Sequence, residues 1–199
     1  MGVIRYDFSF TAASLRRNDM ILVAKDRVYN RKTDLALLIG AGKSATGKRI
    51  LSECNKRVDK LSPAQLRLLL HGDLITQNQM AFLAVCKCHP FIRDFVVEIA
   101  REKLLVFDYQ LSEGEYLSFF RRKEEEQPQM VNLSELTQNK VRQVTFKILE
   151  QAGIIDGVKT KVIQPQILDS EVCKAIVSDD AEWLKVFLMS DMDMLNYKI

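Results

Sequence analysis

Glycine and proline are scarce in this chain, and long apolar runs are absent. Its 199 residues include 8 glycines and 4 prolines, so few positions interrupt a helix. The longest apolar stretches, residues 20–24 and 35–41, fall far short of the roughly 18 residues that a membrane-spanning helix needs. Arg5 and Asp7 stand where a secretory signal would have its apolar region. We therefore expect a soluble cytoplasmic protein with no membrane contact.

Histidine and cysteine are also few, and no catalytic pattern contains them. The chain has 2 histidines and 4 cysteines, and without a secretory signal we expect the cysteines to be reduced thiols. The segment Cys86-Lys-Cys88-His89 suggests a metal site, but structural zinc requires a second pair of ligands, and His71 is the other histidine. Neither histidine lies near a serine or cysteine in a nucleophile signature. We expect no enzyme activity, no metal, no cofactor and no small-molecule substrate.

The net charge of +3 is unevenly distributed along the chain. Residues 1–67 hold 14 Lys and Arg against 6 Asp and Glu, residues 68–164 hold 12 against 13, and residues 165–199 hold 3 against 7. A basic segment attracts polyanions such as nucleic acids, whereas an acidic tail repels them. The alternative is a set of solvated helix faces with no ligand.

Apolar residues recur mostly at helical spacing, which predicts an all-α fold of short helices. Residues 73–89 and 90–104 are the most apolar helical stretches, so we expect them to form the core. Ser62-Pro63 and the pair Ser112 and Glu115 are helix-start signals. We expect a helical domain with a basic face at residues 1–110 and a winged-helix-like domain with an acidic tail at residues 111–199.

A glycine-rich segment at residues 38–49 contains Gly-Lys-Ser but does not match a phosphate-binding P-loop. In one register Leu37 replaces the first glycine, and in the other Arg49 replaces the hydroxyl residue that holds magnesium. The segment is better explained as a turn between two helices, the second of them capped by Ser44 or Thr46. Lys43, Lys48 and Arg49 would then surround a helix N-terminus, which favours phosphate. The alternative is an ordinary cap with solvated lysines.

A helix followed by a β-hairpin is expected at residues 132–164. Ser134 or Asn132 would cap the helix, and Gly153 would end it. Asp156-Gly157 between β-branched residues favours a tight turn, which predicts a hairpin near residues 154–164. A helix followed by a basic hairpin is the order of a winged-helix module. The outward face of the helix carries residues suited to bases and phosphates, although such residues are also common on solvated faces.

Distinctive segments occur at residues 46–53 (TGKRILSE), 91–96 (FIRDFV) and 140–144 (KVRQV). Together they resemble the BrxA family, small proteins of the BREX phage-defence systems, and the resemblance covers about residues 10–165. It implies an all-helical fold related to the NusB-like antitermination proteins, double-stranded DNA binding and a role in bacteriophage exclusion. It brings no catalytic motif.

Our leading hypothesis is a non-enzymatic, double-stranded DNA-binding component of a BREX system that works with other BREX proteins. One alternative is a protein-interaction adaptor within the same assembly, and another is an RNA-binding antitermination-like factor. The expected DNA-contacting residues are basic or polar and belong to three segments. They are Arg16, Arg17, Lys43, Ser44, Lys48, Arg49, Lys56 and Arg57 in the basic third, Gln138, Asn139, Lys140, Arg142, Gln143 and Lys147 on the helix, and Lys159 and Lys161 on the hairpin.

Overall fold

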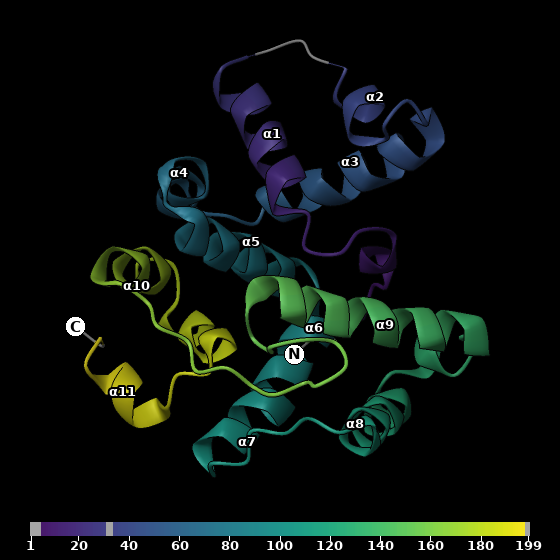
Figure 1. Ribbon diagram of the computed structural model, residues 1–199, viewed down its shortest axis with the longest axis vertical. Helices are drawn as coiled ribbons and strands as arrows, with labels where there is room; N and C mark the ends of the chain where they lie inside the picture. The colour runs from purple at the N-terminus through teal and green to yellow at the C-terminus, as the bar shows by residue number, and fades with distance from the viewer. Residues whose placement is uncertain (1–4, 31–33, 198–199) are drawn as a thin grey trace.

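The computed structural model describes residues 5–30 and 34–197, apart from the side chain of Ser44, and it is predominantly helical (Figure 1). No helix in these ranges is long and apolar enough to cross a membrane. The helices are α1 (Arg17–Val28), α2 (Leu35–Ile39), α3 (Ser44–Val58), α4 (Pro63–His71), α5 (Leu74–Cys88), α6 (Pro90–Phe95), α7 (Glu102–Leu105), α8 (Glu113–Glu126), α9 (Glu135–Ala152), α10 (Ser170–Val177) and α11 (Asp191–Leu195). The 3-10 helices are η1 (Ser9–Ala12), η3 (Pro128–Met130) and η4 (Ala181–Phe187), and η2 (Val96–Arg101) is a π-helix.

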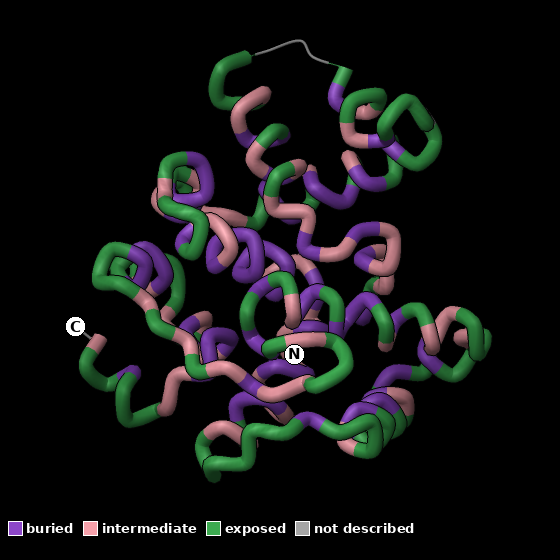
Figure 2. The backbone as a smooth tube through the Cα atoms, in the orientation of Figure 1, coloured by how far each residue is buried: buried purple, intermediate pink, exposed green. Residues whose placement is uncertain are grey.

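The centre of the molecule is α5 and the helical run that follows it, as the apolar pattern predicts. The Asp73 side chain caps α5, and all residues from Gln79 to Cys86 are buried. Pro90 opens α6, which continues through the π-helical turn η2 into α7. Figure 2 shows buried backbone gathered in the middle of the molecule, including α5. The expectation that residues 73–89 and 90–104 belong to the core is confirmed.

Aromatic side chains join the N-terminal segment, α8 and α9 around α6. The ring of Phe91 lies 5.5 Å from that of Tyr6, near the N-terminus, and 5.3 Å from that of Phe119 on α8. Phe95 lies 5.9 Å from Phe146 on α9. Offset and edge-on ring pairs at these separations are favourable. Residues from both predicted domains therefore share one hydrophobic core, and the division into residues 1–110 and 111–199 stays a prediction.

Most helix ends follow the local signals in the sequence. Ser62 and Ser112 form capping boxes at the starts of α4 and α8, and Ser134 caps α9. Gly153 ends α9 in the left-handed conformation, with φ of 76°. The start of α3 differs: its N-cap residue is Lys43, which makes no side-chain capping bond, so the prediction that Ser44 or Thr46 occupies the cap is wrong.

The predicted β-hairpin near residues 154–164 is also wrong. This segment is a loop that holds one isolated β-bridge, between Ile155 and Ile163, and the described residues contain no strand. A type I′ hairpin turn needs positive φ at both central residues, and neither Asp156 nor Gly157 has it. Instead, the Asp156 carboxylate accepts hydrogen bonds from Thr160 and the Val162 N–H.

This loop is held against the chain that precedes α8. The Leu111 N–H donates to the Lys161 carbonyl at 3.1 Å, and the Ile163 N–H donates to the Tyr109 carbonyl at 2.7 Å. The Gln110 side chain donates to the Thr160 carbonyl. Within the segment, the Asp156 N–H donates to the Val162 carbonyl and the Gln164 N–H donates to the Ile154 carbonyl, so its other edge is the one that pairs with residues 109–111. The segment does not form the β-wing expected of a winged-helix module.

A glycine contact fixes the corner between α2 and α3. The two helices are joined by residues 40–43, and a Cβ atom added at Gly47 would lie 1.7 Å from the Ala36 carbonyl oxygen. Real Cβ atoms do not approach backbone oxygen so closely, so α2 can pack against α3 only where residue 47 has no side chain.

We expect Gly47→Ala to lower the free energy of unfolding by at least about 2 kcal/mol, because α2 must move away from α3. The matched control is Gly114→Ala on α8, where the added Cβ meets nothing closer than the Ser112 hydroxyl at 3.8 Å. That change should stabilise the fold by up to about 1 kcal/mol. Urea unfolding followed by circular dichroism measures both, and equal stability of the two variants would contradict this packing.

Candidate nucleic-acid interface

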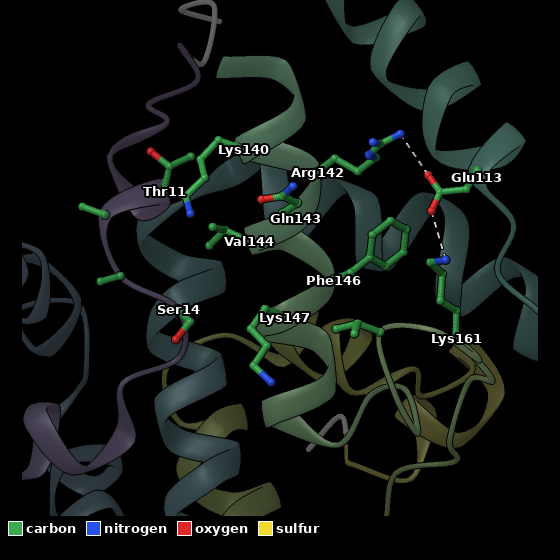
Figure 3. Close-up of a pocket in the computed structure, with 13 residues that line it drawn as sticks. Thr11, Ser14, Glu113, Lys140, Arg142, Gln143, Val144, Phe146, Lys147 and Lys161 are labelled. Atoms are coloured by element: carbon green, nitrogen blue, oxygen red, sulfur yellow. Dashed lines mark hydrogen bonds and ion pairs between the residues drawn. The ribbon is translucent and has the colours of Figure 1, made fainter. Parts of the chain in front are cut away.

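A groove of about 600 Å³ lies over the outer face of α9. We call it the α9 groove. One wall is residues 11–14, from η1 and the chain after it, and the other wall includes Glu113 and Lys161 (Figure 3). The groove therefore brings together three segments that are far apart in the sequence.

The face of α9 in the groove follows from helical spacing. Val141, Val144, Thr145, Ile148 and Leu149 are buried on one side of α9, so the exposed positions lie on its other side. Lys140, Gln143 and Lys147 are exposed and line the groove, and Figure 3 shows them on the side that faces residues 11–14. The five predicted residues brought together here are Lys140, Arg142, Gln143, Lys147 and Lys161.

A second, polar hollow of about 450 Å³ adjoins the α9 groove at Ser14, which lines both. It contains two further predicted residues, Arg16 and Arg17. Arg16 is the N-cap residue of α1, has a φ of 53°, and pairs with Asp19 at 2.8 Å. The floor is tied to α9, because the Leu15 N–H donates to Gln151. Basic residues far apart in the sequence thus line two hollows that share Ser14.

The α9 groove is cationic, although some of its charge is compensated within the protein. Four of its lining residues are Lys or Arg and one is Glu. Glu113 pairs with Arg142 at 3.3 Å and with Lys161 at 2.9 Å, while Lys147 pairs with Glu150 outside the groove. Lys140 and Gln143 are the exposed polar residues of its floor. Such a surface suits a polyanion that runs along α9.

Three of the predicted residues on α9 and the following loop do not line the groove. The Gln138 side chain donates to the Leu133 carbonyl, and the Asn139 side chain accepts from Arg142. Lys159 is exposed on the loop. Gln138 and Asn139 thus contribute to local structure, and a role for these three residues in binding DNA stays a prediction.

The basic residues at the start of α3 form a separate surface. Lys43, Lys48 and Arg49 are exposed, and they line neither the α9 groove nor the polar hollow. The side chain of Ser44 lies outside the described part of the structure. Lys56, further along α3, is exposed and pairs with Asp7 at 3.4 Å. Because η1 contacts both α3 and α9, it links this surface to the groove.

Arg57 is buried, so its predicted contact with DNA phosphate is wrong. Its side chain is 0% exposed and donates to the carbonyls of Ala13, Ser14 and Leu15 at 2.7, 2.5 and 3.3 Å. Its Nε also donates to Glu53 at 2.9 Å. Each of the three guanidinium nitrogens therefore donates to a partner within the protein. Helical spacing alone did not separate Arg57 from Lys56, and the burial of Arg57 depends on the N-terminal segment folding over α3.

The carboxylate of Glu53 is the centre of this buried network. It accepts hydrogen bonds from Arg57, from His89 and from the Ser9 hydroxyl. Burial acts to raise the pKa of Glu53, but the hydrogen bond and charge of His89 and the charge of Arg57 outweigh it and lower the pKa to about 2. The carboxylate is therefore ionised at neutral pH.

Glu53, Cys88 and His89 also form a group of metal-ligand types, with one donor atom of each lying within 4.8 Å of the others. A metal ion there would displace the present donors to Glu53 and approach the positive charge of Arg57. Burial raises the pKa of Cys88 to about 11, which disfavours the thiolate that binds metal. The group is better explained as a structural charge network.

Sequence reasoning missed two parts of the groove, the wall at residues 11–14 and Glu113. Residues 11–14 (TAAS) carry no charge and no motif. Glu113 lies beside the capping residue Ser112, and nothing near it in the sequence indicates that it faces Arg142 and Lys161. Both become visible only when α8, α9 and the N-terminal segment are packed together.

The fold and the groove define an all-helical protein with a cationic groove formed by three segments that are far apart in the sequence. The model of the BrxA family matches residues 4–180, so the chain belongs to the BrxA family. A curated relative, the "BREX protein BrxA" of Bacillus cereus (strain H3081.97), is 24% identical over 130 residues, which are 65% of this chain and 65% of that protein.

A solved structure has the same fold. It is the crystal structure of an uncharacterized protein from Magnetospirillum magneticum, which is 18% identical, with a TM-score of 0.79. The match covers 94% of this chain and 99% of that chain. The helical arrangement described above is therefore found nearly complete in a chain of low sequence identity.

We expect Arg57→Met to lower the free energy of unfolding by about 3–5 kcal/mol, because it removes the arginine partner of the buried Glu53 carboxylate and leaves the carbonyls of residues 13–15 without this donor. Lys56→Met removes the same charge one residue earlier, from a half-exposed side chain, and should change stability by no more than about 0.5 kcal/mol. Urea unfolding of both variants tests this difference. Equal losses would show that the buried network does not stabilise the fold.

Proposed function

We propose that this protein is a non-enzymatic, double-stranded DNA-binding component of a bacterial BREX phage-defence system. Membership of the BrxA family supports the role in phage defence. Other BREX proteins are the proposed protein partners, and the cytoplasm is the proposed location. The observation that supports DNA binding is that the basic residues of α9 and Lys161 line one hollow, while Arg16 and Arg17 line a second hollow that shares Ser14 with it.

Duplex DNA fits this surface because its charge is dense and regularly repeated. Phosphate contacts supply most of the affinity of sequence-independent binding, and they release condensed counterions. The exposed Lys140 and Lys147 lie two turns apart on α9, which spaces positive charge along the groove. Gln143 lies between them and can donate to or accept from a base edge. The surface at the start of α3 would extend the contact beyond η1.

We expect duplex DNA to bind in a salt-dependent manner. About six phosphate contacts predict a slope of roughly −5 in a plot of log association constant against log salt concentration. Fluorescence anisotropy with a labelled duplex, titrated at several potassium chloride concentrations, measures this slope. Absence of binding at low salt would overturn the proposal. Preferential binding of structured RNA of equal length would favour an antitermination-like factor.

The double variant Lys140→Gln and Lys147→Gln should weaken duplex binding about tenfold or more and make the salt slope shallower by about 2, because two phosphate contacts are lost. The matched control is Arg67→Gln with Lys174→Gln, which removes two exposed positive charges outside the groove. Variants of Lys43, Lys48 and Arg49 should also weaken binding. Equal effects of the α9 pair and its control would show that α9 does not contact DNA. If the variant with Lys140→Gln and Lys147→Gln still binds duplex DNA but no longer assembles with other BREX proteins, the adaptor alternative is favoured.

A further inference from the structure

We propose that Arg142 and Lys161 form a binding subsite for one phosphodiester group, and that Glu113 closes this subsite in the free protein. The carboxylate of Glu113 bridges the two cations: one oxygen lies 3.3 Å from Arg142 Nη1 and the other lies 2.9 Å from Lys161 Nζ (Figure 3). A phosphodiester also presents to a pair of donors two oxygens that share one negative charge. Because it specifies how the α9 groove takes DNA, this proposal rests on the proposed function.

Lys161 is held in place by an unusual backbone conformation. Its φ is 54°, in the left-handed region that residues with a side chain seldom adopt, and such a conformation costs on the order of 1 kcal/mol. The surroundings enforce it, because the Lys161 N–H donates to Gly157 and its carbonyl accepts from Leu111. The ammonium lies 5.2 Å from the centre of the Phe146 ring, and the side chain is 15% exposed. Lys161 is therefore a fixed charge at the edge of the groove.

Arg142 is also oriented by contacts within the protein. Its Nη2 donates to the Asn139 side chain at 3.2 Å, one turn earlier on α9, while its Nη1 faces Glu113. The guanidinium is planar and keeps its charge, so fixing one edge also fixes where the other edge points. Arg142 and Lys161, from α9 and the following loop, thus converge on the position that the Glu113 carboxylate occupies.

Glu113 can leave this position without uncapping its helix. It is the first residue of α8, but the capping box of that helix is made by Ser112 and Glu115. Its side chain is 49% exposed, so water can solvate the carboxylate after it moves. A phosphate that replaced it would keep a negative charge near the positive end of α8. Replacing the Glu113 carboxylate with a phosphate therefore costs few stabilising contacts within the protein.

The arrangement makes binding depend on the charge density of the ligand. An isolated anion binds weakly, because it must displace a carboxylate that already pairs with both cations. A duplex brings a phosphate to the subsite while its neighbours contact Lys140 and Lys147, so the displacement is driven by the whole interface. Glu113 therefore reduces the affinity for DNA in general. The reduction is largest for ligands that do not contact Lys140 and Lys147 at the same time.

The test is Glu113→Gln, which keeps the shape of the side chain and removes its charge. We expect it to raise affinity for a labelled duplex about three- to tenfold at low salt and to make the salt slope steeper by about 1, because the two cations become available to phosphate. The matched control is Glu135→Gln, which removes the same charge at the first position of α9, outside the groove. It should change affinity less than about twofold.

A second variant distinguishes displacement from a change in overall charge. Lys161→Asn removes the cation and retains a residue that tolerates the left-handed conformation. In that background, with Arg142→Gln added, Glu113→Gln should no longer raise affinity. Circular dichroism and urea unfolding of each variant confirm that it is folded.

Each outcome decides one of the two proposals. If the unaltered protein binds no duplex, the proposed function fails. If it binds and folded Glu113→Gln binds equally or more weakly, the proposed function stands and closure by Glu113 is wrong. If the gain from Glu113→Gln persists without Arg142 and Lys161, it comes from overall charge, and the subsite is also wrong.

Discussion

The buried guanidinium of Arg57 is the interaction on which the rest of the structure depends. It binds three successive carbonyls of residues 13–15 and the carboxylate of Glu53, so it fixes the N-terminal segment against α3. Glu53 extends the network to His89, the residue between α5 and α6. A buried arginine needs every donor satisfied, and here the backbone of an extended segment supplies most of the acceptors.

This network also shapes the candidate interface. Residues 11–14 are one wall of the α9 groove, and residues 13 and 14 accept directly from Arg57. On the other side of the wall, Gln151 of α9 accepts the Leu15 N–H. The N-terminal segment is thus held between α3 and α9 by polar contacts at adjacent residues. Arg57 therefore supports the candidate interface from beneath, and it is too buried for the direct contact that its charge suggested.

The sequence predicts features that depend on a few neighbouring residues. The caps at Ser62, Ser112 and Ser134, the stop at Gly153 and the apolar core at α5 and α6 follow from local spacing and are confirmed. Features set by distant parts of the chain are not predicted. Lys56 and Arg57 have the same charge and adjacent positions, and only the folding of residues 13–15 over α3 buries one and leaves the other exposed.

The chain before α8 sets the position of Lys161. Local signals predict a hairpin at residues 154–164, but the segment contains no strand. Its internal pairing is limited: the Asp156 N–H donates to the Val162 carbonyl and the Gln164 N–H donates to the Ile154 carbonyl. The opposite edge of the segment pairs with the chain before α8, where the Leu111 N–H donates to Lys161 and the Tyr109 carbonyl accepts from Ile163. Because residues 109–111 lead directly into α8, this pairing brings Lys161 close to Glu113. A contact that local turn signals do not encode therefore places the ion pair at the edge of the α9 groove.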